Sequence, residues 1–198
     1  MMRKVQRCLL ACLALPLAVL GSNSQANETY RFDPSHSIIR FTVHQFLGTT
    51  VGKFTKFEGK IDIDRDHPEQ SSVMAKIDVR SINTGIAKRD DHLRNADFFD
   101  VAKYPEITFT SHSVKQTAAK SGDIVGDLTM HGVTKPITLH VALISPISAA
   151  ASRTLWAVTT EPLKRRDFGL TFGQTAEAVS GISQTVAIRI EIEATRTQ

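Results

Sequence analysis

Cysteine is nearly missing from this chain of 198 residues: Cys8 and Cys12, both close to the N-terminus, are its two occurrences. Disulfide frameworks, thiol catalysis and cysteine-ligated zinc sites all need cysteines in the folded part of a protein. The sequence therefore excludes all three for the residues that follow Cys12.

Long apolar runs are also scarce, and the one that is present lies at the start of the chain. A basic region at residues 3–7 precedes an apolar run from Cys8 to Leu20, and Ser24-Gln25-Ala26 has the small-x-small pattern of a cleavage site. This arrangement predicts that residues 1–26 are a cleaved secretory signal peptide. We therefore expect a periplasmic mature chain, residues 27–198, folded as a single domain.

A membrane anchor and a lipid anchor are the rival interpretations of this segment. The apolar run is shorter than the roughly 20 residues that a membrane-spanning helix needs, and it contains Pro16. Cys12 lies inside the apolar run rather than after it, which argues against lipidation. Neither anchor is expected.

An excess of charge of one sign is absent as well. Once Arg3, Lys4 and Arg7 leave with the signal peptide, the 24 basic residues fall to 21, against 20 acidic ones. A nearly neutral chain lacks the basic surface by which proteins bind nucleic acid. No nucleic-acid partner is expected.

Catalytic motifs are the last absence. The chain has no GxSxG elbow, no HExxH pair and no glycine-rich phosphate loop after a strand. None of the histidines has metal-ligand spacing, so structural or surface roles are expected for them: His36, His44, His67, His92, His112, His131 and His140. The sequence therefore predicts no enzyme, no cofactor and no metal site.

Strand patterns dominate what is present. Apolar and polar residues alternate with a period of two in many segments, the signature of strands with one buried face. These segments are 39–43, 57–63, 73–79, 107–109, 124–130, 137–144, 155–160 and 186–192. About eight antiparallel strands in one domain predict an all-β barrel or sandwich, and Gly132 is expected to supply a positive φ in one of its hairpins.

Residues 86–102 interrupt this pattern and predict one short helical insertion. Thr84 can cap the helix, and Asp90 and Arg94 have the favourable spacing for an ion pair. Asp90 and its neighbour Asp91 are expected on a solvated face. Tyr104 precedes Pro105 and is pushed towards extended geometry, which returns the chain to a strand.

Phenylalanine is abundant, with ten residues against two tyrosines and one tryptophan, and all ten follow the signal peptide. Phe offers rigid apolar surface with no polar atom, which suits an ordinary core and a cavity for an apolar ligand alike. The alternation and the position of the helix favour Phe41, Phe98, Phe99 and Phe109 as residues of a ligand-binding bore or its cover.

One basic cluster stands out, Lys164 to Leu170. Arg165 and Arg166, with the adjacent Phe168, could meet a phosphate head group at a barrel mouth. A solvated hairpin with an Arg–Asp pair explains the cluster equally well.

Several segments resemble the YceI-like family of periplasmic polyisoprenoid-binding proteins. Two long blocks carry the resemblance: 89–109 (RDDHLRNADFFDVAKYPEITF) and 126–139 (GDLTMHGVTKPITL). Residues 30–37 are similar to the family's opening strand, and Phe46-Leu47 with 51–54 to its next segment. The turn at 166–169 also resembles the family.

The resemblance spans about Tyr30 to Ala194 and implies a lipocalin-like antiparallel barrel of about eight strands. It implies a non-catalytic protein that carries or stores a long-chain isoprenoid lipid, such as a quinone precursor or a prenyl phosphate, in its bore. Strands of about nine residues at ~3.3 Å each give a tube near 30 Å long, which suits an extended chain. A homodimer is compatible with this role.

Two alternatives remain open at this stage. A stress or partner-binding protein would have a barrel filled by its own side chains. A lipid-modifying enzyme would need a polar cluster in the bore, and the sequence shows none with recognisable spacing.

Overall fold

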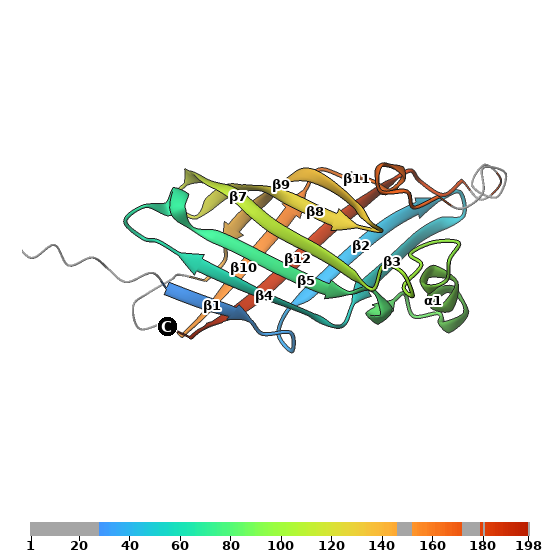
Figure 1. The fold of residues 1–198 in the computed structure, drawn as a ribbon, viewed down its shortest axis with the longest axis horizontal. Coiled ribbons are helices and arrows are strands. Elements are labelled where there is room, and N and C mark those ends of the chain that lie inside the picture. The colour runs from blue at the N-terminus through green and yellow to red at the C-terminus, as the bar shows by residue number, and fades with distance from the viewer. Residues whose placement is uncertain (1–27, 146–151, 172–178, 180, 198) are drawn as a thin grey trace, which may run out of the picture.

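The computed structural model describes residues 28–145, 152–171, 179 and 181–197, which form an antiparallel β-barrel with one α-helix at one end (Figure 1). The expected signal peptide, residues 1–26, lies outside the described residues. Among the described residues, no helix is both long and apolar enough to cross a membrane.

The elements of the described residues follow one another along the chain in a simple order. The strands are β1 (Glu28–Phe32), β2 (Ile38–Gln45), β3 (Gly48–Phe54), β4 (Phe57–Ile63), β5 (Ser72–Asp78), β6 (Ile82–Asn83), β7 (Glu106–Ala118), β8 (Ser121–Met130), β9 (Val133–Leu143), β10 (Arg153–Thr160), β11 (Leu163–Lys164) and β12 (Thr185–Arg196). The α-helix is α1 (Ala87–Arg94), and short 3-10 helices are η1 (Pro68–Gln70), η2 (Val79–Ser81) and η3 (Arg165–Phe168).

Eight strands close the barrel in the order β1-β4-β5-β7-β8-β9-β10-β12, and β12 pairs back onto β1. The register of this closing pair joins Tyr30 to Arg196 and Phe32 to Ala194. β2 pairs with an earlier part of β12, residues 187–191, with Ile39 opposite Ile190. The predicted all-β antiparallel barrel of eight strands is confirmed.

The hairpin of β2 and β3 extends the wall of the barrel beyond the closed ring. β2 pairs with β3, and β3 pairs on its other side with the two-residue strand β6. In the chain, α1 follows β6 after three residues (Figure 1). The hairpin, α1, η3 and the β8–β9 turn therefore share one end of the barrel, which we call the α1 end. The β4–β5 connection with η1 and the β7–β8 hairpin form the opposite end, the η1 end (Figure 1).

The alternation predicted from the sequence decides which side chains face inwards. On β8, Ile124, Leu128 and Met130 are buried, while Val125 between them is exposed. At the β8–β9 turn, Gly132 has the expected positive φ, at 75°, and His131 has 52°. The His131 ring packs against Tyr104, with ring centroids 4.5 Å apart, so its role here is structural.

The helical insertion is shorter than the sequence predicts. α1 covers eight residues, and the chain then passes through turns because Asn95 is extended and Asp100 has a positive φ of 46°. Thr84 does not cap the helix: the residue before its first turn is Ile86, whose side chain makes no capping bond.

Both expectations for Asp90, a solvated position and an ion pair with Arg94, were wrong, whereas Asp91 is exposed as expected. Asp90 is buried rather than solvated, and its carboxylate accepts hydrogen bonds from the backbone N–H and the hydroxyl of Thr84, at 2.9 and 2.5 Å. Arg94 pairs with Asp91 at 2.9 Å instead of Asp90. Asp90 thus fixes the chain entering α1, because a buried carboxylate needs hydrogen-bond donors.

A buried carboxylate joins the first and last strands at the η1 end. Glu28 on β1 lies 2.7 Å from Arg65 and 3.2 Å from Arg196 on β12, and the hydroxyl of Tyr30 donates to it at 2.9 Å. Burial by itself would raise the pKa of Glu28, but the hydrogen bonds from Arg65 and Tyr30 and the charges of both arginines outweigh burial, so the pKa is lowered.

Replacing Glu28 with Gln is expected to destabilise the barrel by about 1.5–3 kcal/mol at neutral pH, since Arg65 and Arg196 lose a charged acceptor that they share. A carboxyl with a lowered pKa stabilises the fold above its ordinary pKa of 4.5 and loses this effect as the pH falls below it. The gap between wild type and variant in urea midpoints should therefore narrow below about pH 4. A gap independent of pH would show that Glu28 contributes by packing alone.

Candidate functional site

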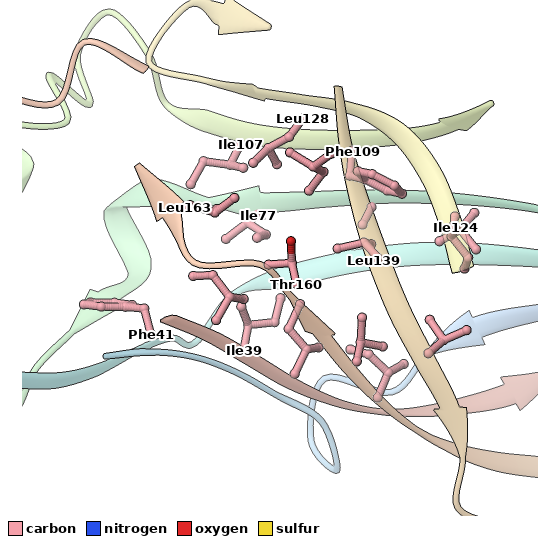
Figure 2. A pocket seen from close by; sticks show the side chains of 18 of the residues that line it. Ile39, Phe41, Ile77, Ile107, Phe109, Ile124, Leu128, Leu139, Thr160 and Leu163 are labelled. Atoms are coloured by element: carbon pink, nitrogen blue, oxygen red, sulfur yellow. The ribbon is translucent and has the colours of Figure 1, made fainter. Parts of the chain in front are cut away.

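An apolar cavity of about 700 Å³ runs inside the barrel. Every strand of the closed ring contributes side chains to its wall, and β2 and β3 add to it at the α1 end. Figure 2 shows part of this wall, with Ile39, Ile77, Phe109 and Leu139 among the aliphatic and aromatic side chains that meet around the cavity. Such a lining suits an apolar ligand.

Aromatic rings gather at the α1 end of the cavity. Phe54 lies between Phe41 and Phe99, with ring centroids 5.7 Å and 6.4 Å away, and the contact with Phe99 is edge-to-face. Phe98 packs against the ring of His92, 5.9 Å between centroids. All five residues line the cavity. The connection after α1 thus brings the predicted Phe98-Phe99 pair over the bore.

Glycines on neighbouring strands leave room for rings along the wall. A Cβ on Gly52 would lie 2.2 Å from the ring of Phe41, its cross-strand partner. Likewise, a Cβ on Gly59 would lie 2.2 Å from the ring of Phe32, and one on Gly126 would lie 2.6 Å from that of Phe109. The rings occupy the space of missing side chains, as in aromatic rescue of glycine in designed sheets, and project less into the bore.

Gly52→Ala is expected to narrow the bore without unfolding the barrel. The new methyl group would overlap the end of the Phe41 ring, and this side chain can rotate towards the cavity. Uptake of a long apolar chain should fall roughly tenfold, which corresponds to about 1.4 kcal/mol of lost contact. Binding of a fluorescent lipid would measure this, and Phe41→Leu in the same variant should restore it. Unchanged affinity in the single variant would mean that the ring moves elsewhere.

Polar side chains of the cavity wall gather at its two ends. At the α1 end these are Gln45, Thr50, Arg89, His92 and Arg165, and at the η1 end Asp64, Arg65, Ser71, Gln116, Lys120 and Ser121. Thr160 places a hydroxyl group in the otherwise apolar region that Figure 2 shows. A ligand with one polar end and a long apolar body would match this distribution.

The cavity's α1 end contains two guanidinium groups. Arg165 is buried, and it donates to the backbone carbonyls of Ser183 at 3.1 Å and Leu170 at 2.8 Å. Arg89 donates to the hydroxyls of Thr84 and Thr50, at 2.7 and 3.1 Å. These contacts hold both guanidinium groups in place, and those of Arg89, all with neutral groups, leave its charge available to an anion.

The structure brings together five of the seven residues expected to bind a ligand: Phe41, Phe98, Phe99, Phe109 and Arg165 all line the cavity. The other two do not lie in its wall. Arg166 is exposed, and Phe168 is buried in the core, where its carbonyl lies 3.2 Å from Nδ1 of His131. The 3-10 turn η3 explains the difference, because consecutive residues of a turn point in different directions.

Three residues of this end escaped the sequence-based prediction: Phe54, Thr50 and Arg89. The period-two pattern of 50–54 could have indicated Thr50 and Phe54, since both are buried and share one face of β3. Arg89 carried no such signal, because its position depends on where α1 docks.

A group of possible metal ligands lies away from the cavity. Asp33, His36 and Glu193 converge at the β1–β2 turn. Hydrogen bonds from Ser35 and then His36 lower the pKa of Asp33 to about 2, and Arg153 binds Glu193 at 2.8 Å. These contacts already engage the carboxylates, so the group fastens the turn to β12.

The comparisons with known proteins agree over most of the chain. A family model described as the YceI-like domain matches residues 30–194. A UPF0312 protein of Ectopseudomonas mendocina is 34% identical over 196 residues, 94% of this chain and 97% of that protein. A UPF0312 protein of Pseudomonas putida strain KT2440 is 34% identical over 188 residues, 92% of this chain and 94% of that one.

Solved structures share the fold. Burkholderia cenocepacia BcnA has a TM-score of 0.75 at 24% identity and covers 83% of this chain and 99% of its own. The Campylobacter jejuni YCEI protein has a TM-score of 0.63 at 29% identity, over 74% and 85%. A polyisoprenoid binding domain from Saccharophagus degradans, implicated in plant cell wall breakdown, has 0.65 at 23% identity, over 85% and 98%.

Proposed function

Because the chain belongs to the YceI-like family, we propose that it is a periplasmic carrier that holds a long-chain polyisoprenoid in the bore of its barrel. The observation that carries the proposal is the apolar cavity of about 700 Å³ that runs between two polar ends. A barrel filled by its own side chains would lack this space, so the cavity favours a carrier over the partner-binding alternative.

The length of the cavity favours an extended ligand. Its wall includes Phe98, which follows α1, and Ala118, the last residue of β7, and α1 and the β7–β8 hairpin lie at opposite ends of the barrel (Figure 1). β12 has 12 residues, so at ~3.3 Å per residue it spans roughly 40 Å along its tilted path. A linear prenyl chain can contact such a wall along its whole length, whereas a globular metabolite would leave much of it empty.

The comparisons support the ligand class. The Saccharophagus degradans domain that shares this fold is described as binding a polyisoprenoid. A prenyl chain consists of carbon and hydrogen, and the central wall has the matching aliphatic character. Because the polar groups collect at the ends, the proposal is one of binding without catalysis.

Arg89 at the α1 end favours an anionic head group, and we place the head of the ligand there. A phosphate or diphosphate would meet Arg89 while the chain extends towards the η1 end. Quinone head groups would gain less from this charge.

Arg89→Gln should weaken a prenyl phosphate about tenfold or more and leave the matching prenyl alcohol nearly unchanged, because a hydrogen bond to a charged group contributes about 1.5–3 kcal/mol. Lys88→Gln is the matched control, since Lys88 is exposed and lies outside the cavity wall. Calorimetric titration with both ligands measures the difference. Equal losses for phosphate and alcohol would place the head group elsewhere.

The compartment is part of the proposal. Residues 1–26 have the pattern of a secretory signal peptide, and we propose that the mature chain begins at Asn27 in the periplasm. N-terminal sequencing of the protein from a periplasmic extract tests this, and a retained N-terminus or a lipid on Cys12 would contradict it.

Mass spectrometry of an organic extract tests the carrier function most directly. Protein purified from its native periplasm without detergent should release a prenyl lipid in a ratio approaching one per chain. A side-chain-filled barrel would release none. An extract without prenyl lipid, together with no binding of added prenyl alcohols, would rule the proposal out.

A further inference from the structure

The turn of the β2–β3 hairpin exposes large apolar side chains at the α1 end. Gln45 pairs with Gly48, so Phe46 and Leu47 form a two-residue tip. The exposed fraction is 75% for Phe46 and 102% for Leu47. Tight turns usually carry polar residues or glycine, and apolar side chains that remain exposed gain nothing on folding.

Two further exposed apolar residues lie on the same hairpin or next to the helix that contacts it. Val51, 53% exposed, follows on β3. Ile86, also 53% exposed, precedes α1, whose Arg89 donates a hydrogen bond to Thr50 of the same hairpin. We call Phe46, Leu47, Val51 and Ile86 the apolar rim.

The tip is supported from one side and lies next to residues of the cavity wall. A Cβ on Gly181 would lie 2.4 Å from the Phe46 ring, so this ring rests on the backbone there. Next to the tip, Gln45 donates to Thr50 at 2.6 Å, and both side chains line the cavity. The same hairpin thus lines the bore with one face and presents apolar side chains at its tip.

The hairpin has an uncharged stretch next to its tip and basic residues beyond that stretch. No Asp, Glu, Lys or Arg occurs from Phe41 to Gly52. Just beyond this stretch, Arg40 and Lys53 are cross-strand partners, and Arg189 is the partner of Arg40 on β12. All three are exposed, and we call them the basic row. Arg189 also lies 3.8 Å from Glu191.

This order of apolar tip, uncharged middle and basic row fits an anionic lipid bilayer. The basic row lies six residues from the tip, roughly 20 Å along the strands. Insertion of a tip by ~5–10 Å would leave the basic row at most about 10–15 Å above the membrane surface, near the distance over which anionic lipids attract cations at physiological salt.

We propose that the apolar rim docks the protein on an anionic phospholipid bilayer, with the mouth of the bore facing the lipid. The inference rests on the proposed carrier function, because a prenyl chain is itself a membrane lipid and must enter the bore from a bilayer. Four side chains expose a few hundred Å² at most, less than the ~800 Å² per partner of a standard protein interface, so a bilayer fits better than a second copy.

Flotation of the mature protein with vesicles tests the docking surface. The vesicles are pure phosphatidylcholine or a mixture of phosphatidylcholine with phosphatidylglycerol. The variant Phe46→Ser/Leu47→Ser removes the tip. The control Met74→Ser/Val125→Ser removes two exposed apolar residues from the barrel wall. The variant Arg40→Gln/Lys53→Gln reduces the basic row.

Wild type and the wall variant are expected to float with the anionic vesicles, and the tip variant should bind them at least about tenfold more weakly. The charge variant should bind anionic vesicles no better than neutral ones. No binding by wild type, or equal binding by the tip variant, would overturn the proposal. A wild type that is dimeric in sedimentation equilibrium, with a monomeric tip variant, would also overturn the proposal, since a second copy would then cover the rim.

Extracting the lipid from each variant separates this proposal from the carrier function. A tip variant that keeps its bound prenyl lipid but loses vesicle binding supports docking as a separate step. Empty extracts from every variant would defeat the carrier function, and the flotation result would still decide the docking surface.

Discussion

Affinity for linear prenyl alcohols is expected to rise by orders of magnitude as five-carbon units are added, and to level off when the chain fills the bore. Each buried methylene contributes about 0.8 kcal/mol before the entropy of ordering the chain is subtracted. The aliphatic wall can supply this gain along the cavity until the chain reaches the polar groups of the η1 end. Competition against a fluorescent prenyl probe measures the series.

The shape of this series is more informative than any single affinity. A plateau gives the number of units that the cavity accommodates. The same series with straight alkanols is the control, because it separates chain length from the branching of prenyl groups. Affinities that do not depend on length would contradict an extended ligand in the bore.

Phe41→Asp is expected to abolish retention of a prenyl lipid, with an affinity loss of about a hundredfold or more. Its ring lies in the cavity wall against Phe54, and a carboxylate there would lose its hydration to a hydrocarbon chain. Lipid recovered per mole of purified protein gives the readout. Phe41→Leu, which stays apolar, should retain most of the lipid.

The same substitution could unfold the barrel, so the fold of the variant must be measured alongside. Val125→Asp introduces the same carboxylate on the outer face of β8 and should leave both fold and binding intact. Circular dichroism compares the fold of the wild type with those of Phe41→Asp and Val125→Asp. A folded Phe41→Asp variant that copurifies with a full complement of lipid would place the ligand away from Phe41.

The barrel could be predicted from the sequence because a strand with one buried face has a period of two. Ile124, Leu128 and Met130 show this pattern in the sequence and are buried in the structure. The family resemblance over Tyr30 to Ala194 then decided between barrel and sandwich, and the family match to residues 30–194 confirms it.

The end of the barrel with α1 was harder to predict, because its contacts join residues that are distant in sequence or lie in irregular turns. Arg89 reaches Thr50 across 39 positions, and no local pattern records that pairing. Asp90 was expected on a solvated face, yet it turns inwards to the backbone of Thr84. Arg165 and Arg166 are neighbours of the same residue type, and only the geometry of η3 decides that Arg165 is the one that lines the cavity.

The closing strand has a consequence for how the protein is made. β12 is the last strand of the chain, and it pairs with β1, β2, β10 and β11. Until residues 185–196 leave the ribosome, β1, β2 and β10 lack this partner, and their unpaired edges invite aggregation. Closure also joins Tyr30 to Arg196, which are far apart in the sequence, and such distant contacts form slowly. The barrel therefore cannot close before residues 185–196 have been made, and a chain that stays open this long is suited to the export that we propose.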